Sequence, residues 1–341
     1  MPDNELPGSG PAAGAVTDFE RTRPLPPATL SQPPVLAIAG PTAAGKSALA
    51  LQLWERLHGQ AEIVSVDSAQ VYRGMDIGTA KPDATTRTLV PHHLLDLLDP
   101  AETYSAARFA EDARRVIGEI RGRGRWPLLV GGTMLYFRAL LQGLSDLPPA
   151  DPELRARLEA EAAAHGWEAL HRRLAEVDPE TAARLHPNDA QRIQRALEIC
   201  ELSGEPASHR FKRRPAEGWT DQVVRVAVCP PSRPELHQRI ERRFLAMIEL
   251  GFVDEVARLR RRGDLHPDLP SMRAVGYRQL WRHLDGEYGL DRAIEQGLAA
   301  TRQYAKRQLT WLRGESGWHW LDPGEPNAAA EVLNLAGSAR P

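Results

Sequence analysis

Residues 35–53 hold the feature that most constrains the fold, a glycine-bounded turn between an apolar strand and a helix. The apolar run Val35-Leu-Ala-Ile-Ala leads into Gly40-Pro-Thr-Ala-Ala-Gly45-Lys46-Ser47, and apolar residues then recur at helical spacing. Such a turn places backbone N–H groups around phosphate oxygens at a helix N-terminus. We therefore expect the N–H groups of residues 43–46 to bind phosphate, Lys46 to add charge and the Ser47 hydroxyl to be available to Mg²⁺. The loop alone does not identify the phosphorylated ligand.

Two further strands end in polar residues. The short β-branched run at residues 61–66 leads into Asp67, and residues 128–130 lead into Gly131-Gly132-Thr133. The carboxyl ends of parallel strands meet at one edge of an α/β sheet, where ligands bind. We therefore expect Asp67 and Thr133 beside the phosphate loop. Three roles remain open for Asp67 from pattern alone: magnesium ligand, general base or strand-end cap.

The order of these patterns predicts a core with an insertion. Residues 1–34 contain eight prolines and no apolar periodicity, which predicts a disordered extension. Residues 35–146 and 211–322 predict an α/β, P-loop NTPase-like core with a mostly parallel sheet and C-terminal helices. Residues 147–210 begin at a proline-rich hinge and show only helical patterns, which predicts an inserted all-helical domain. The Ala-, Gly- and Pro-rich residues 323–341 are expected to form a flexible tail.

Charge and composition narrow the partners. The 43 Lys and Arg residues against 45 Asp and Glu give a net charge of −2, so a nucleic acid would have to meet local basic faces. Neither the two cysteines nor the adjacent His92 and His93 have the spacing of a metal site. The sequence shows no membrane-length apolar run and no leader, so we expect a cytoplasmic protein with no membrane partner.

Two predicted helices carry side chains that could meet RNA. The helix near residue 191 turns Ile193 inward and leaves Gln191, Gln194 and Arg195 together on another face, although such a face is ordinarily a solvated surface. The helix that follows residue 291 mixes Lys306 and other cations with aromatic residues, which suits phosphates and unstacked bases together. This second face favours a structured RNA as a substrate.

Seven motifs, in order, resemble those of the tRNA dimethylallyltransferases, also called tRNA isopentenyltransferases. They lie between residue 35 and about residue 322. The zinc finger that some eukaryotic relatives add is absent, which indicates the bacterial type. The motifs are Gly-Pro-Thr-Ala-Ala-Gly-Lys-Ser (40–47), Asp-Ser-Ala-Gln-Val-Tyr-Arg-Gly-Met-Asp-Ile-Gly-Thr-Ala-Lys-Pro (67–82), Pro-His-His-Leu (91–94), Gly-Gly-Thr-Met-Leu-Tyr (131–136), Gln-Arg-Ile-Gln-Arg-Ala-Leu-Glu (191–198), Arg-Ala-Val-Gly-Tyr-Arg (273–278) and Lys-Arg-Gln-Leu-Thr-Trp-Leu-Arg (306–313).

The resemblance implies transfer of a dimethylallyl group from dimethylallyl diphosphate to N6 of the adenosine 3′-adjacent to the anticodon of tRNA. The phosphate loop would then hold the departing diphosphate, with Mg²⁺ as cofactor. The N6 amine must lose a proton as it bonds, and the family assigns the general-base role to the residue that matches Asp67. We expect a monomer whose partners are the tRNA anticodon stem-loop and dimethylallyl diphosphate.

The resemblance also implies a role for individual residues. The catalytic residues are Asp67, Thr133, Lys46 and Arg243. The diphosphate-binding residues are Gly40, Thr42, Ala43, Ala44, Gly45, Lys46, Ser47 and Arg239, with Ser47 also the metal ligand. The tRNA-binding residues are Asp67, Ser68, Ala69, Gln70, Thr133, Arg155, Gln191, Arg192, Ile193, Gln194, Arg195, Arg273, Gly276, Tyr277, Arg278, Lys306, Arg307, Gln308, Trp311 and Arg313.

Three other classes share part of the pattern. A small-molecule or nucleotide kinase would share the phosphate loop without needing the two RNA-facing helices. An adenylate isopentenyltransferase would share the chemistry and lack the tRNA-contacting module. A phosphate-binding RNA chaperone would need neither Asp67 nor Thr133.

Overall fold

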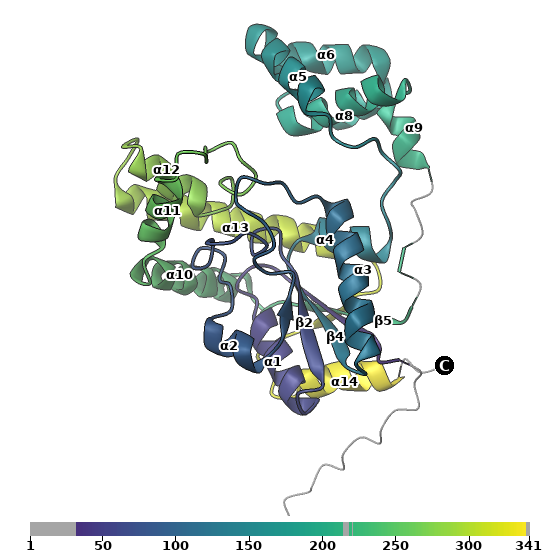
Figure 1. Cartoon of the computed structure of the whole chain (residues 1–341), viewed down its shortest axis with the longest axis vertical. Coiled ribbons are helices and arrows are strands. Elements are labelled where there is room, and N and C mark those ends of the chain that lie inside the picture. Colours follow the sequence, from purple (N-terminus) through teal and green to yellow (C-terminus); the bar gives the residue numbers. More distant parts are fainter. Residues whose placement is uncertain (1–31, 214–217, 220, 339–341) are drawn as a thin grey trace, which may run out of the picture. The chain divides into compact units, whose positions relative to one another are not determined.

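A parallel sheet lies at the centre of the computed structural model, which describes residues 32–213, 218–219 and 221–338 (Figure 1). Its six strands are ordered β3-β2-β4-β1-β5-β6, and every neighbouring pair is parallel. This confirms the expected α/β core. The strands are β1 (Val35–Ala39), β2 (Ala61–Val66), β3 (His92–His93), β4 (Trp126–Gly131), β5 (Val223–Val228) and β6 (His319–Leu321).

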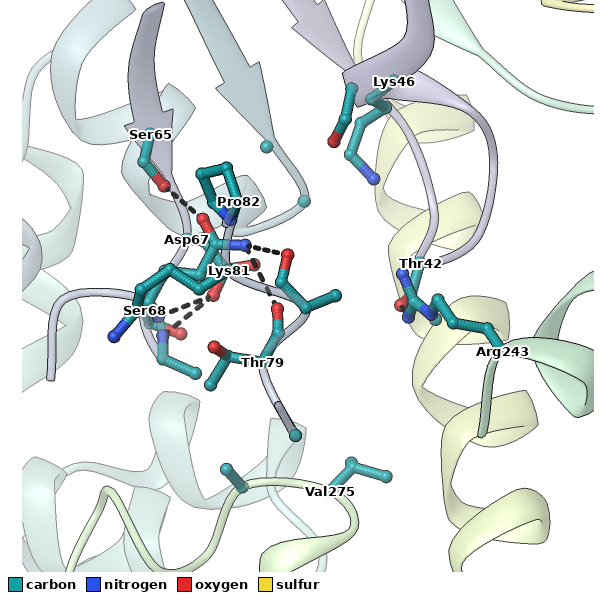
Figure 2. Close-up of a pocket in the computed structure, with 18 of the residues that line it drawn as sticks. Thr42, Lys46, Ser65, Asp67, Ser68, Thr79, Lys81, Pro82, Arg243 and Val275 are labelled. Atoms are coloured by element: carbon teal, nitrogen blue, oxygen red, sulfur yellow. Dashed lines mark hydrogen bonds between the residues drawn. The ribbon is translucent and has the colours of Figure 1, made fainter. Parts of the chain in front are cut away.

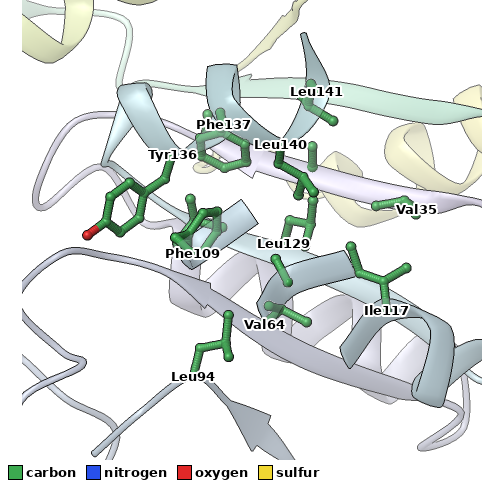
Figure 3. Packing of buried hydrophobic residues seen from close by; sticks show 14 of the residues in the cluster. Val35, Val64, Leu94, Phe109, Ile117, Leu129, Tyr136, Phe137, Leu140 and Leu141 are labelled. Carbon is green, nitrogen blue, oxygen red and sulfur yellow. The ribbon is translucent and has the colours of Figure 1, made fainter. Parts of the chain in front are cut away.

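Helices cover both faces of the sheet, because alternate residues of each strand point to opposite sides. On one face Val64 and Leu129 pack with Phe109 of α3 (Ala106–Gly122) and Phe137 of α4 (Met134–Leu141) (Figure 3). On the other face the neighbouring strand residues pack against α1 (Lys46–Arg56) and α14 (Ala328–Ser338). The central strands are therefore buried on both sides.

Helix α14 contradicts the predicted flexible tail over residues 328–338. Its Ala328, Val332 and Ala336 side chains are buried in the same core as α1. Alanine is the best helix former, and small side chains allow a helix to pack closely. The composition that indicated a frayed end therefore produces a close-packed helix. The predicted disordered extension lies outside the described residues except for residues 32–34, where the Pro33 carbonyl accepts a 2.9 Å hydrogen bond from Arg121.

A third apolar cluster joins the segment after β2 to the helices of the C-terminal half. Phe252 and Tyr277 pack there with Met75, and the buried Glu255 carboxylate accepts hydrogen bonds from the backbone N–H groups of residues 76–78. The loop after β2 is thus held by a carboxylate from a distant helix. The helices concerned are α10 (Arg233–Glu249), α11 (Phe252–Arg260), α12 (Tyr277–Leu284) and α13 (Leu290–Gly314), whereas α2 (Ala84–Leu89) lies between β2 and β3 outside this cluster. None of the helices in the described ranges is long and apolar enough to cross a membrane.

The predicted insertion, residues 147–210, contains helices that pack around a core of their own. Leu158, Leu170, Leu174 and Leu197 are buried there. The first helix begins where Asp151 accepts hydrogen bonds from two backbone N–H groups. The helices are α5 (Pro152–His165), α6 (Trp167–Val177), α7 (Pro179–Arg184), α8 (Ala190–Ser203) and α9 (Ala207–Lys212).

Candidate active site

The phosphate loop joins β1 to α1 in a conformation that requires its glycines. A side chain on Gly40 would place its Cβ 2.3 Å from the Val228 carbonyl oxygen. Gly45 has a φ of 97° and forms the N-cap of α1. Pro323, from the segment before α14, lies 3.1 Å from the position that a Cβ on Gly45 would occupy. The loop is therefore fixed by its own backbone and by the C-terminal segment packed on it.

Two cations flank this loop. Lys46 donates a 2.8 Å hydrogen bond to the Pro41 carbonyl, and Arg243 of α10 donates to the Thr42 hydroxyl. Burial and, to a smaller extent, the positive charge of Arg243 lower the pKa of Lys46 to about 8, against the opposing charge of Asp67. Burial also lowers the pKa of Arg243. No ion pair to either cation is formed within the described residues. Two buried positive charges without counter-ions there favour a bound anion.

Asp67 and Thr133 form a second group at the ends of β2 and β4. The Asp67 Oδ1 atom accepts a 2.9 Å hydrogen bond from the Ala69 N–H. The Thr133 hydroxyl accepts a 3.0 Å bond from the Ser68 N–H and lies 3.3 Å from the Ser68 hydroxyl. Within the described part of the chain, Oδ2 of Asp67 has no hydrogen-bond partner. One carboxylate oxygen is thus held by the turn and the other is available to a ligand.

A cavity of about 800 Å³ brings the two groups together. In Figure 2, Lys46, Thr42 and Arg243 lie on one side, and Asp67 and Ser68 lie on the other. Apolar side chains of α10 and of the 270–275 loop complete the lining. The cavity can therefore hold a charged group at one end and a group that gives up a proton at the other.

The residues expected to bind tRNA divide by exposure. Gln191, Arg192, Arg273, Lys306, Arg307 and Arg313 are exposed, and Arg307 also lines the cavity. Ile193 and Tyr277 are each 0% exposed, since Ile193 lies in the core of the insertion and the Tyr277 hydroxyl donates to Glu255. Gly276 is buried as the N-cap of α12. The structure therefore does not place these three residues where their side chains could reach RNA.

Other members of that set already have partners within the protein. Arg155 and Arg195 both donate to the buried carboxylate of Glu198. Gln194 donates to the Arg155 carbonyl, and Arg138 lies over the half-buried Trp311 ring, 5.8 Å from its centroid. Arg278 is half-buried, and burial lowers its pKa. Arg239 of α10 pairs with Glu235 and also lies near the phosphate loop.

Gln308 lines the cavity, but most of its side chain is enclosed by the protein. It is only 5% exposed and bonds to the turns after β1 and β4. Its neighbours Lys306 and Arg307 are exposed, so one motif on α13 supplies both an inward and an outward face.

Tyr304 is a cavity residue that the sequence analysis did not assign. It lies one helical turn before Gln308 and lines the cavity. Burial, reinforced by the charge of Asp67, raises the pKa of its phenol, which therefore stays neutral and able to donate a hydrogen bond. Its i, i+4 spacing from Gln308 was the available signal.

The parallel sheet, the phosphate loop and the carboxylate across the cavity define a P-loop enzyme that acts on a phosphorylated donor. The chain belongs to the IPP transferase family, whose model matches residues 70–315. This confirms the resemblance found in the sequence motifs.

Relatives and solved structures of the same kind cover most of the chain. The tRNA dimethylallyltransferase of Halorhodospira halophila is 61% identical over 284 residues, 83% of this chain and 91% of that protein. That of Bordetella petrii is 58% identical over 306 residues, covering 89% and 97%. The full-length tRNA isopentenylpyrophosphate transferase from Bacillus halodurans has a TM-score of 0.63 at 40% identity, covering 89% of this chain and 95% of that one. A eukaryotic dimethylallyltransferase acting on tRNA has a TM-score of 0.74 at 28% identity, covering 91% and 80%.

Proposed function

We propose that this chain transfers a dimethylallyl group from dimethylallyl diphosphate to N6 of the adenosine 3′-adjacent to the anticodon in tRNA. The observation that carries the proposal is the cavity itself. Lys46 and Arg243 lie at one end, and Asp67 lies at the other with only its Oδ1 atom hydrogen-bonded among the residues that the structure describes. Transfer to an amine needs both groups: the cations for the departing diphosphate and the carboxylate for the proton.

The donor end stabilises the departing diphosphate. As the C–O bond of the donor breaks, negative charge grows on the diphosphate oxygens, and Lys46 and Arg243, which line the cavity beside the phosphate loop, would stabilise that charge. Donors fixed in advance lower the barrier because they need not reorganise during the reaction. The carbon–nitrogen bond forms as the carbon–oxygen bond breaks, and diphosphate is released.

The acceptor end removes the proton of the amine. Asp67 is the general base, because its Oδ2 atom is available while Oδ1 is held by the turn. Thr133, whose hydroxyl accepts a hydrogen bond from the Ser68 N–H, would orient the turn that carries Asp67. The target adenosine lies in a loop of the RNA, so it can enter the cavity at a modest cost in unstacking.

The residues around the loop also fit Mg²⁺ carried by the substrate. In the described ranges no group of three His, Cys, Asp or Glu side chains could hold a metal. Mg²⁺ commonly takes only one or two protein oxygens and keeps substrate phosphates and water. Ser47, exposed in the first turn of α1 and lining the cavity, is the proposed protein ligand. When bound, the ion would neutralise charge on the diphosphate.

The RNA would be bound mainly by the exposed cations Arg192, Arg273, Lys306, Arg307 and Arg313. We propose that the protein acts as a monomer. A tRNA substrate also supports a cytoplasmic location.

The decisive experiment incubates the protein with labelled dimethylallyl diphosphate, Mg²⁺ and either tRNA or AMP. We expect label in tRNA alone, at N6 of the adenosine next to the anticodon. Label in AMP but not in tRNA would identify an adenylate isopentenyltransferase. Hydrolysis of ATP without transfer of label would identify a kinase or an NTPase.

A further inference from the structure

Gln308 joins two neighbouring turns that line the active-site cavity, one after β1 and one after β4. Its Oε1 atom accepts a 2.9 Å hydrogen bond from the Thr42 N–H in the phosphate loop. Its Nε2 atom donates a 2.8 Å bond to the Gly132 carbonyl oxygen at the end of β4. Both ends of the amide are therefore engaged, and the residue is only 5% exposed.

The two turns carry the two halves of the proposed reaction. Thr42 lies in the phosphate loop, which also contains Lys46, and its hydroxyl accepts a hydrogen bond from Arg243 of α10. Gly132 directly precedes Thr133, whose hydroxyl accepts from the Ser68 N–H beside Asp67. A displacement of either turn would change the spacing between the diphosphate and the base.

The local packing leaves room for this amide and for little else. A Cβ on Gly132 would lie 2.2 Å from Nε2 of Gln308, so the glycine vacates the space that the amide fills. Bonding to both the Thr42 N–H and the Gly132 carbonyl needs one acceptor and one donor on the same side chain, which a neutral amide provides. An ionised glutamate at this position could accept from Thr42 but could not donate to Gly132.

We infer that Gln308 is a positioning residue that sets the spacing between the diphosphate loop and the turns that carry Thr133 and Asp67. The inference rests on the proposed function, because it assigns these turns to the two substrates. It differs from the tRNA contact that the family resemblance implied, since both polar atoms of the amide are already bonded to the protein. Misplacing reacting groups by about 1 Å can cost about a hundredfold in rate.

The test compares Gln308→Met with the control Gln303→Met. Gln303 is exposed on the same helix. We expect Gln308→Met to lower kcat with both substrates saturating by about 10- to 100-fold, with tRNA affinity within about twofold of wild type. Gln303→Met should match wild type in both. Unchanged kcat with weakened tRNA binding would instead assign Gln308 to an RNA contact and overturn the inference.

A second variant separates positioning from general packing. The carboxyl group introduced by Gln308→Glu can donate to the Gly132 carbonyl only when it is protonated. We therefore expect the ratio of its kcat to that of wild type to rise as the pH falls from about 8 to about 6, while the ratio for Gln308→Met stays constant. A ratio for Gln308→Glu that does not change with pH would contradict the role in hydrogen bonding.

The activity of the wild-type protein separates failure of the proposed function from failure of the positioning role. If wild-type protein does not label tRNA, the proposed function fails. If wild type is active and Gln308→Met is equally active, only the positioning role fails.

Discussion

Glu62 and Asp67 belong to the same strand region, one near the start of β2 and one just past its end, and their surroundings are opposite. Glu62 is 2% exposed and bonds to Arg123, Arg125 and His93 at 2.6–3.1 Å. Burial alone would raise its pKa, but the hydrogen bonds and charges of Arg123 and His93 outweigh burial and hold the pKa at about 2. This carboxylate is fully satisfied by the protein.

Asp67 has only the amides of its own turn as partners within the described residues, and it faces Lys46 and Arg243 across a cavity. Near the start of β2, the charge of Glu62 is neutralised by neighbouring side chains. At the edge where the strands end, the negative Asp67 and the positive Lys46 and Arg243 stay separated by the cavity. A satisfied charge contributes to stability, and a charge left without a partner is available for binding or proton transfer. The contrast predicts that substitutions at the two carboxylates affect different properties.

The largest effect is expected at Asp67. Asp67→Asn keeps the shape of the side chain and removes the base, so kcat for labelling an anticodon stem-loop should fall by about 10²- to 10⁴-fold. Affinity for the RNA should remain within a few-fold, as a gel-shift titration would show. Turnover near that of wild type would refute the assignment of Asp67 as the base.

Glu62→Gln should act in the opposite manner. It leaves Arg123 and Arg125 without their shared carboxylate, and we expect a loss of about 2 kcal/mol in the free energy of unfolding, after allowing for the partial exposure of both arginines. Urea denaturation would measure this loss, and kcat should be unchanged. A loss of activity without a loss of stability would show that Glu62 contributes to the reaction and not to the stability of the fold.

The same pair predicts a pH dependence. Because the folded-state pKa of Glu62 is held below its ordinary value of 4.5, its contribution is present above that value and is lost as the pH falls through about 2. The urea midpoint of wild type should therefore decline more steeply below pH 4.5 than that of Glu62→Gln. If the urea midpoints of the two proteins fell in parallel with pH, other carboxyl groups would determine the loss of stability in acid.

A smaller effect is expected at Lys46. With a pKa of about 8, its ammonium loses a proton at mildly alkaline pH, so affinity for inorganic diphosphate should fall above pH 8, by at most about tenfold per unit. Competitive inhibition by diphosphate would measure this decline. Lys46→Arg should remove the inflection because guanidinium stays charged, and an inflection that survives would have to belong to another group.

Local patterns predicted the parts of the molecule that depend on local chemistry. The strands ending at Gly40, Asp67 and Gly131 were placed from short apolar runs, and parallel topology then brought their ends together. The role of His93 could not be predicted from the sequence, because its partner Glu62 lies on another strand. The single motif containing Lys306 could not reveal which of its side chains face inward.

Burial and pairing between distant segments explain the remaining differences. The buried Glu198 engages Arg155 and Arg195, which in sequence look like free cations. Helix α14 forms from alanines whose spacing shows little contrast between faces, so only its contact with α1 reveals its inner side.

The phosphate loop lies early in the sequence, yet its supports come late. Arg243, Gln308 and Pro323 contact the loop from segments synthesised long after residue 47. Chains emerge from the ribosome N-terminus first. A nascent chain that carries the loop therefore gains Arg243, then the amide of Gln308, and last the contact with Pro323 as translation proceeds. Catalytic competence thus arrives near the end of synthesis, and a polypeptide arrested earlier would possess the phosphate motif without the means to use it.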